Sequence, residues 1–400
     1  MAASPAMASR GRRVAITGYG VVAPCGLGKQ AFWQGLLGPN LSSGRTVEIA
    51  DWDPNPYFDN PKDARRADRV EQFALAAAME CMAQSGMPDC DDSRIGTIFG
   101  TGVGGLRSIE DQIRVLIDKG ERRVSPFLVP MMMANASGAA ISMRYGFRGP
   151  CETVCTACAA STHAIGYAAR MIAWGMVDAC VTGGAESAGC AIGVSSFGNM
   201  TALSTEGASR PFSPERDGFV LGEGAAVFML EEWESAVARG ATIVGEVLGA
   251  ASNADAHHIT APAPGGTGAI KCMHAALHDA GLSPADIRHI NAHGTSTPLN
   301  DAAEAAAVTS VFGAGGVPVT STKGVTGHAL GAAGALEAAA VLLSMEHRLI
   351  PPTAGTTRLD DGMDIDLVMG APRPWEPGPT MSNSLGFGGH NGSVILGPAT

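Results

Sequence analysis

Short apolar runs alternate with longer Ala-rich stretches along the chain. Apolar runs bounded by glycine, such as "RVAITGYGVVAP" (13–24) and "IGTIFGTGVGG" (95–105), predict buried strands. Ala-rich stretches with apolar residues at helical spacing predict helices, and the one over 69–85 is expected to end at Gly86. Regular alternation of these two kinds of element is typical of α/β proteins, in which helices cover sheets.

The second part of the chain echoes the first. "TACAASTHAIGYAARMI" (156–172) and "VTGHALGAAGALEAAAVL" (325–342) each lead from a strand, through a turn of small residues with one reactive side chain, into an Ala-rich helix. We therefore expect two similar halves, residues 12–250 and 251–398, whose turns face each other.

Composition narrows the class of protein. Only 16% of the 400 residues are charged and the net charge is −11, so nothing favours nucleic acid or an anionic membrane as a partner. Nine cysteines, most of them in apolar runs, indicate reduced thiols in the cytoplasm. The segment "MAASPAMASRGRRVAITG" lacks the apolar core of a signal peptide, and the most apolar run, 330–345, is too short to cross a bilayer.

Three cysteines lie within eight positions in "CETVCTACAAS" (151–161). Their spacing is compatible with a metal cluster, a redox pair or a single nucleophile. Cys158 is expected where a strand gives way to a helix, so that the N–H groups and dipole of the helix end favour its thiolate and can receive an oxyanion. Alternatively, Cys158 has no chemical role and only fills the core as a small apolar side chain.

Two histidines occupy comparable turns. His293 follows a predicted strand in "NAHGTSTPLND" (291–301), and His328 precedes a helix in "STKGVTGHALGAAGALE" (321–337), five residues after Lys323. Asp301 and Glu304, one helical turn apart, either orient a histidine or lysine or act as helix-start acids.

A further glycine-rich turn, "NSLGFGGHNG" (383–392), carries Phe387 and is either a backbone loop beside a ligand or a structural hairpin.

A thiolate with two imidazoles can perform acyl chemistry. The cysteine accepts an acyl group as a thioester, and the imidazoles donate hydrogen bonds to a second thioester as its carboxylate leaves as CO2.

Taken together, these motifs closely resemble the β-ketoacyl-acyl carrier protein synthases of the elongating type II class. "RYGFRGPCETVCTACAAS", "VTGGAES" and "ASRPFSPERDGFVLGEGA" fit the same family, so that the resemblance covers residues 12–397. It implies an α/β, thiolase-like fold with two similar halves in a five-layer αβαβα arrangement. It also implies a homodimer, substrates carried on the phosphopantetheine of an acyl carrier protein, and no metal or other cofactor.

The resemblance assigns roles to individual residues. Cys158 would be the acyl nucleophile, His293 and His328 would stabilise decarboxylation of a malonyl thioester, and Cys151 and Cys155 would be packed thiols on the preceding strand. The supporting residues are Lys323 with its network of Glu337, Asp301 and Glu304, Phe387 as gate and oxyanion donor, and Thr260, Thr295 and Thr297 as contacts of the pantetheine.

Docking of an acidic carrier on a chain of net charge −11 requires a local basic patch. Two basic runs are candidates for this patch, and each could instead be an ordinary solvated surface. The first run contains Arg65, Arg66 and Arg69, and the second contains Lys119, Arg122 and Arg123. Glu206, in the short segment "ALSTEGASRP", stands where the family commonly has a basic docking residue.

The methionines 131–133 either shape an acyl tunnel or fill the core.

The predicted function is decarboxylative condensation of an acyl-enzyme with a malonyl-carrier thioester in fatty acid elongation. A polyketide-type ketosynthase that works with a partner subunit and a scaffold without catalysis are the alternatives. The presence of Cys158, His293, His328 and Lys323 together argues against the scaffold. A thiolase is also disfavoured, because no cysteine follows Cys272.

Overall fold

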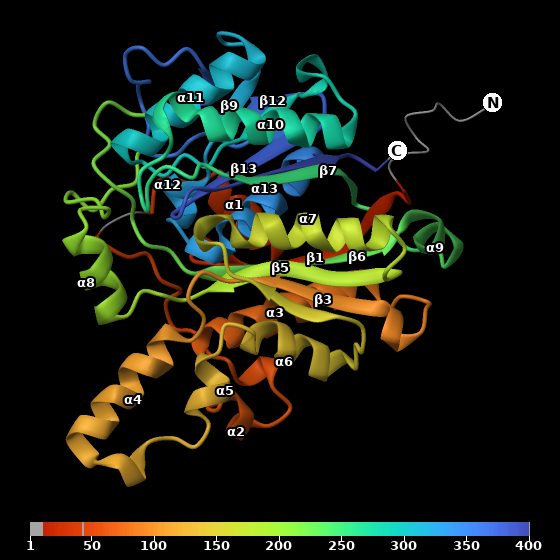
Figure 1. The fold of residues 1–400 in the computed structure, drawn as a ribbon, viewed down its shortest axis with the longest axis vertical. Helices are drawn as coiled ribbons and strands as arrows, with labels where there is room; N and C mark the ends of the chain where they lie inside the picture. Colours follow the sequence, from red (N-terminus) through yellow and green to blue (C-terminus); the bar gives the residue numbers. More distant parts are fainter. Residues whose placement is uncertain (1–10, 42–43, 400) are drawn as a thin grey trace.

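The computed structural model describes residues 11–41 and 44–399, and its elements stack in five layers (Figure 1). Helices form the two outer layers and a central layer, and a β-sheet separates the central helices from each outer layer. The alternating pattern predicted an α/β fold, and the family resemblance implied this five-layer αβαβα arrangement. The amino-terminal segment in which no signal peptide was expected lies largely outside the described residues.

The first sheet carries the amino-terminal strands. Its order is β4 (Cys151–Val154), β3 (Ile95–Gly100), β5 (Ala179–Glu186), β6 (Gly224–Glu232) and β1 (Val14–Ala23). All ten residues of β1 are buried, as expected for a strand covered on both faces. The outer face is covered by α3 (Arg69–Ser85) and α6 (Ala136–Tyr145). A Cβ at Gly20 of β1 would lie 2.1 Å from the carbonyl oxygen of Ala77, so glycine permits this close contact with α3.

The second sheet carries the carboxy-terminal strands. Its order is β11 (Asp366–Leu367), β9 (Pro318–Thr320), β8 (His289–Asn291), β13 (Thr380–Gly386), β14 (His390–Gly397) and β7 (Gly245–Ala254). Its outer side carries α10 (Thr267–Ala280) and α11 (Pro298–Phe312). β1 and β7 pair over two residues and so join the sheets along one edge. The expected boundary at 250/251 falls inside β7, and the division of the chain there stays a prediction.

The central layer brings the two echoing segments together. α7 (Ala160–Ala173) follows the single-turn helix η5 (Ala157–Ala159), and α13 (Ala333–His347) follows η8 (Leu330–Ala332). η5 and η8 contact each other, as do α7 and α13. The first residue of each turn has a positive φ, 49° at Ala157 and 43° at Leu330. The repeated pattern therefore places two similar strand-to-helix turns face to face.

The remaining elements lie around this frame. They are α1 (Lys29–Leu36), α2 (Pro61–Ala64), α4 (Leu106–Lys119), α5 (Leu128–Met132), α8 (Ala191–Asn199), α9 (Trp233–Ala238), α12 (Lys323–Thr326), β2 (Gly26–Leu27), β10 (Leu349–Ile350) and β12 (Arg373–Pro374). Within the described residues, no helix combines the length and the apolar character needed to cross a bilayer. The cytoplasmic location inferred from the cysteines stays a prediction.

Candidate active site

Cys158 lies in η5 at the start of α7, but the strand before it is shorter than predicted. β4 ends at Val154, and the chain then turns through Ala157. Cys151 and Cys155 are exposed in the single chain, so neither is packed within it as expected. Within the described parts of the chain, neither belongs to a group of side chains that could hold a metal ion. Only Cys158 of the three is buried beside other reactive groups.

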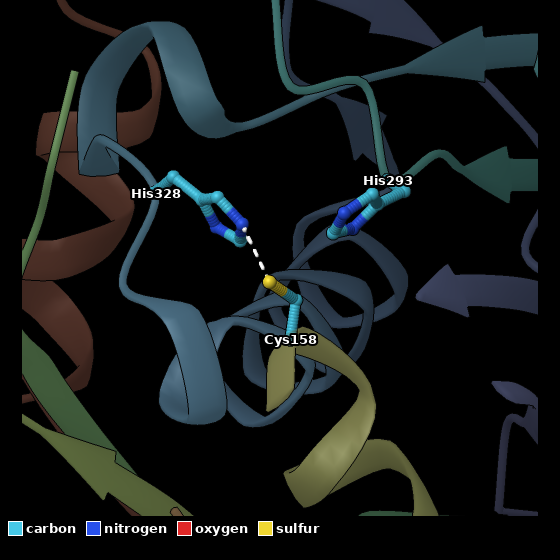
Figure 2. A group of neighbouring side chains, drawn as sticks. All are labelled: Cys158, His293 and His328. Atoms are coloured by element: carbon cyan, nitrogen blue, oxygen red, sulfur yellow. Dashed lines mark hydrogen bonds between the residues drawn. The ribbon is translucent and has the colours of Figure 1, made fainter. Parts of the chain in front are cut away.

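Two histidines from the carboxy-terminal part of the chain lie beside this sulfur (Figure 2). The Nε2 atom of His328 is 3.1 Å from the Sγ atom of Cys158. Sγ and one ring nitrogen of each histidine all lie within 4.8 Å of one another. The two imidazoles meet edge to face, with ring centroids 5.2 Å apart. The structure therefore brings together the three groups that the sequence assigned to acyl chemistry.

Burial determines the protonation of the thiol. It raises the pKa of Cys158 to about 12, although the ammonium of Lys323 and hydrogen bonds from the backbone N–H groups of Phe387 and Cys158 oppose this rise. The backbone N–H groups thus favour the thiolate, as the sequence suggested, but burial outweighs them. His328 Nε2 is placed to accept the proton when the sulfur attacks.

Both imidazoles are neutral. Burial lowers the pKa of His293 and of His328 well below the usual histidine value, and the charge of Lys323 lowers both further. The Nζ atom of Lys323 lies 3.4 Å from Nδ1 of His293. Because an ammonium group only donates, Nδ1 accepts and the proton resides on Nε2. His293 can thus present an N–H donor beside the sulfur of Cys158.

Lys323 is held by a buried ion pair with Glu337 and also donates to the carbonyl oxygen of His293 at 2.6 Å. The predicted contact of this lysine with Glu337 is therefore present. Glu304 instead accepts from the backbone N–H groups of His293 and Gly294, at 2.7 and 2.8 Å.

Asp301 also binds the backbone. It accepts from the N–H groups of Phe212 at 2.8 Å and Ser296 at 3.1 Å, and Ser296 has a φ of 67°. These carboxylates fix the loop that carries His293. The orienting role was thus the better of the two alternatives, but it acts through the main chain.

A thiol and two imidazoles at these distances could also coordinate a metal ion such as zinc. The charge of Lys323 beside His293 opposes this, because it would repel a second cation in a buried site. The electrostatics favour a substrate on which negative charge develops.

A cavity of about 520 Å³ opens onto the three groups. Thr260, Thr295, Thr297 and Phe387 line it together with Cys158. The hydroxyl oxygens of Thr295 and Thr297 are 2.9 Å apart. Phe387 lies in the turn between β13 and β14, so this segment is both a hairpin and a wall of the cavity.

Sequence reasoning missed two aromatic residues of the cavity and one buried carboxylate, Glu186, that holds the backbone of a lining residue. Phe197 and Phe219 line the cavity, and the Phe219 ring meets the His328 ring edge-on with centroids 5.1 Å apart. Glu186, at the end of β5, accepts from the N–H groups of Gly102 at 2.5 Å and Gly331 at 3.0 Å. A carboxylate after two glycines in "VTGGAES" was the available signal. The methionines 131–133 are partly exposed and, among the described residues, are not part of the lining.

Some of the basic residues predicted to dock the carrier are exposed, whereas others are bound to neighbouring groups of the chain. Arg69 forms an ion pair with the buried Glu223 and donates to the carbonyl oxygen of Ile49, so its assignment to an open docking patch is wrong. Arg65 is exposed, and Arg66 lies over the Phe127 ring at 4.5 Å.

Lys119, Arg122 and Arg123 are exposed at the far end of α4. This helix is at the bottom of Figure 1, whereas α11, whose first residues line the cavity, is at the top. Glu206 forms an ion pair with Arg210 at 3.3 Å. Gly102 and Val103, which precede α4, also line the cavity, so the 14 residues of α4 separate the second basic run from that part of the lining.

The chain matches known proteins over nearly its whole length. Residues 40–236 match the beta-ketoacyl synthase N-terminal domain, and residues 244–357 match the C-terminal domain. The chain is 41% identical over 409 residues to 3-oxoacyl-[acyl-carrier-protein] synthase 2 of Vibrio cholerae, which spans 96% of this chain and 99% of the relative. It is 41% identical over 402 residues to the protein of the same name from Synechocystis sp., spanning 95% of this chain and 96% of the relative.

Solved structures agree with this assignment. A beta-ketoacyl synthase from Burkholderia phymatum superposes with a TM-score of 0.90 at 32% identity, covering 97% of this chain and all of that one. The ishigamide ketosynthase/chain length factor also gives a TM-score of 0.90, at 33% identity, covering 98% of this chain and all of that one. The resemblance and the thiolase-like fold inferred from the motifs are confirmed, and the chain belongs to the beta-ketoacyl synthase family.

Proposed function

We propose that this chain catalyses the decarboxylative condensation of an acyl group on Cys158 with malonyl-acyl carrier protein, yielding 3-ketoacyl-carrier protein and CO2. The observation that carries the proposal is the convergence of one buried thiol and two neutral imidazoles at the base of a cavity. The curated relatives bear the name 3-oxoacyl-[acyl-carrier-protein] synthase 2, which supports a carrier-bound substrate in fatty acid elongation.

The first half-reaction transfers the acyl group. The Cys158 sulfur attacks the thioester carbonyl of the acyl-carrier protein, and its proton passes to Nε2 of His328. The developing oxyanion is held by the backbone N–H groups of Cys158 and Phe387, which already converge on the sulfur. Cleavage of the old thioester bond then releases the carrier thiol, which takes up the proton.

The second half-reaction forms the new carbon–carbon bond. For this step His328 carries its proton on Nε2, the nitrogen that accepted in the first half-reaction, so its ring changes tautomer once Cys158 is acylated. The malonyl thioester carbonyl then accepts hydrogen bonds from the N–H groups of His293 and His328, so that negative charge is stabilised as the C–C bond to the carboxylate breaks and CO2 leaves. The resulting carbanion attacks the acyl-Cys158 carbonyl and expels the cysteine sulfur, which takes a proton from water. This chemistry needs no metal or other cofactor. The threonines 260, 295 and 297 are suited to hydrogen-bond the pantetheine arm.

The test is to incubate the protein with acyl-carrier proteins of different chain length and malonyl-carrier protein. Intact-mass spectrometry should show an acyl adduct on Cys158, a 3-ketoacyl-carrier product and released CO2. The Cys158→Ala variant should form neither adduct nor product, and iodoacetamide should block turnover of the unmodified protein. Full condensation by Cys158→Ala would refute the proposal.

A homodimer is part of this proposal. β4 is at the end of the first sheet and pairs only with β3 among the described strands, which leaves one edge open to a second copy. Met143 on α6, which packs beside β4, is 77% exposed. An open strand edge with apolar neighbours favours pairing with an identical edge about a two-fold axis. Light scattering coupled to size-exclusion chromatography should give twice the chain mass of 40.7 kDa.

A polyketide-type ketosynthase is the second candidate, because the similar solved structures include the ishigamide ketosynthase/chain length factor. This role requires a partner subunit. Condensation by the purified chain alone favours fatty acid elongation, whereas activity only after a second subunit is added favours the polyketide role.

A further inference from the structure

His163 connects two segments that meet at the sulfur of Cys158. It lies on α7, five residues after the cysteine, and is almost completely buried. Its Nδ1 atom is 2.8 Å from the hydroxyl oxygen of Thr156, and its Nε2 atom is 3.0 Å from the carbonyl oxygen of Asn391. The proposed acyl chemistry assigns this histidine no role.

The two contacts define one tautomer. A carbonyl oxygen only accepts, so the proton is on Nε2 and is donated to Asn391. Burial lowers the pKa of His163, which keeps the ring neutral, and the Thr156 hydroxyl therefore donates to Nδ1. Both ring nitrogens are thus engaged in directional bonds to different segments.

Thr156 follows the end of β4 at Val154 by two residues and directly precedes the nucleophile turn η5. Ala157 follows it with a φ of 49°, a left-handed conformation that costs a residue with a Cβ about 1 kcal/mol or more. The N–H group of Ala159 donates back to the Thr156 carbonyl oxygen at 3.1 Å. The bond from Thr156 to His163 therefore braces a strained turn whose geometry sets the direction of the Cys158 N–H group.

Asn391 anchors the hairpin that carries Phe387. It is on β14 opposite Leu385 of β13, and its side chain donates to Asp255 at 2.7 Å and to Asn253 at 2.9 Å. The hairpin also lies directly against the nucleophile turn. A Cβ at Gly386 would be 3.0 Å from the Thr156 carbonyl oxygen and 3.2 Å from the Cys158 nitrogen.

We infer that His163 is a positioning residue that sets the separation of the two oxyanion donors, the N–H groups of Cys158 and Phe387, by bonding the segment before one and the segment after the other. This rests on the proposed condensation. In that scheme the backbone pair serves attack on the acyl thioester, whereas decarboxylation of the malonyl thioester uses the imidazoles. Loss of His163 should therefore slow acyl transfer selectively.

The test compares the two half-reactions in the full-length protein. The rate of acyl-Cys158 formation is measured by rapid quench and intact mass, and decarboxylation of malonyl-carrier protein is measured as CO2 released without an acyl donor. His163→Leu should slow acylation by about tenfold to hundredfold, the scale of a misplaced oxyanion donor, and should affect decarboxylation much less. His163→Gln, which keeps one donor and one acceptor, should recover part of the rate.

Thr156→Val probes the same link from its other end and leaves the core intact, so it serves if His163→Leu does not fold. It should show the same selective loss, and the two changes combined should cost little more than either alone. His289→Leu is the matched control, since His289 is buried on β8 outside the cavity lining. It should leave the ratio of the two rates unchanged.

Equal slowing of both half-reactions in folded His163→Leu and Thr156→Val, or no slowing in either, would overturn the inference while leaving the proposed function intact. If the unmodified protein forms no acyl-enzyme and releases no CO2, the proposed function fails, and the inference fails with it.

Discussion

Nε2 of His328 lies 3.1 Å from Sγ of Cys158, and both side chains are almost completely buried. Burial raises the pKa of the thiol to about 12 and lowers that of the imidazole well below its usual value. One pKa rises and the other falls, but both shifts favour the neutral form of the group concerned. At neutral pH the pair is therefore a thiol beside an imidazole, and charge appears only as the acyl group is transferred.

This protonation state predicts how Cys158 reacts with an alkylating agent. Iodoacetamide reacts with the thiolate, whose fraction rises about tenfold per pH unit below the pKa of the thiol. We expect the alkylation rate at Cys158 to climb steadily from pH 7 to pH 10. The measurement must resolve peptides by mass, because the exposed Cys151 and Cys155 also react. A rate that is already constant below pH 8 would indicate a preformed thiolate–imidazolium pair.

The two histidines should differ in their effects on the half-reactions. Only His328 is hydrogen-bonded to the sulfur, whereas Nδ1 of His293 is occupied by Lys323. His328→Ala should slow both acyl transfer and decarboxylation. His293→Ala should slow decarboxylation by about a hundredfold or more, as expected for a lost oxyanion donor, and leave acyl transfer nearly unchanged. Single-turnover acylation and CO2 release distinguish these outcomes, and an equal loss of acylation in both variants would contradict the assignment.

The hydrophobic pattern was sufficient to predict the layers but not every strand. β1 and α3 follow it directly, because their apolar residues face the core on both sides of the sheet or along one helix face. β13, "TMSNSLG", was not predicted, since a central strand held by two neighbours can be buried while carrying serine, threonine and asparagine. The backbone N–H and C=O groups of β13 are paired with β8 and β14, so the strand is stable although its side chains do not show an apolar pattern.

The site residues divide in a similar way. The sequence singled out Cys158, His293 and His328 because each occupies a distinctive turn between elements, and the structure places the three side chains together. Arg69 was misassigned because its partner Glu223 is 154 positions away, and only the fold brings them together. Cys151 and Cys155 were expected to be packed, but Cys151 lies on β4, the edge strand of its sheet, and Cys155 follows it; the order of strands in a sheet is not evident from the sequence.

Glu186 predicts a pH dependence of stability. Burial raises its pKa to about 7, against 4.5 for the free side chain, although backbone N–H groups oppose the rise. The folded state therefore retains a proton that the unfolded state releases between these values. Its contribution to stability is complete below pH 4.5 and is lost as the pH rises through 7, amounting to about 3 kcal/mol for such a shift.

Glu186→Gln should lower stability at pH 5. Its amide oxygen can replace Oε2, which accepts from the N–H groups of Gly102 and Gly331, but its NH2 group cannot accept, as Oε1 does, from the Thr101 hydroxyl and the Val103 N–H group. Its unfolding free energy should nevertheless fall less steeply than that of the unmodified protein between pH 5 and pH 8. Glu304 and Glu337 remain in both proteins, so the difference in slope reports Glu186 alone. Parallel curves from urea titrations would show that Glu186 does not ionise in this range.

Arg65, at the end of α2, and Arg69, the first residue of α3, should respond differently to substitution. Arg65 is exposed, and Arg65→Glu should raise the KM for acyl-carrier protein by roughly tenfold at low salt without changing the thermal midpoint. The effect should shrink in 0.5 M salt, where charges are screened. Arg69→Ala leaves the buried carboxylate of Glu223 without its main cation, and we expect a loss of roughly 3 kcal/mol of unfolding free energy. Arg122→Glu, in the single turn that follows α4, is the matched control. A larger rise in KM for Arg122→Glu than for Arg65→Glu would contradict docking at the segment before α3 and would indicate docking at the end of α4.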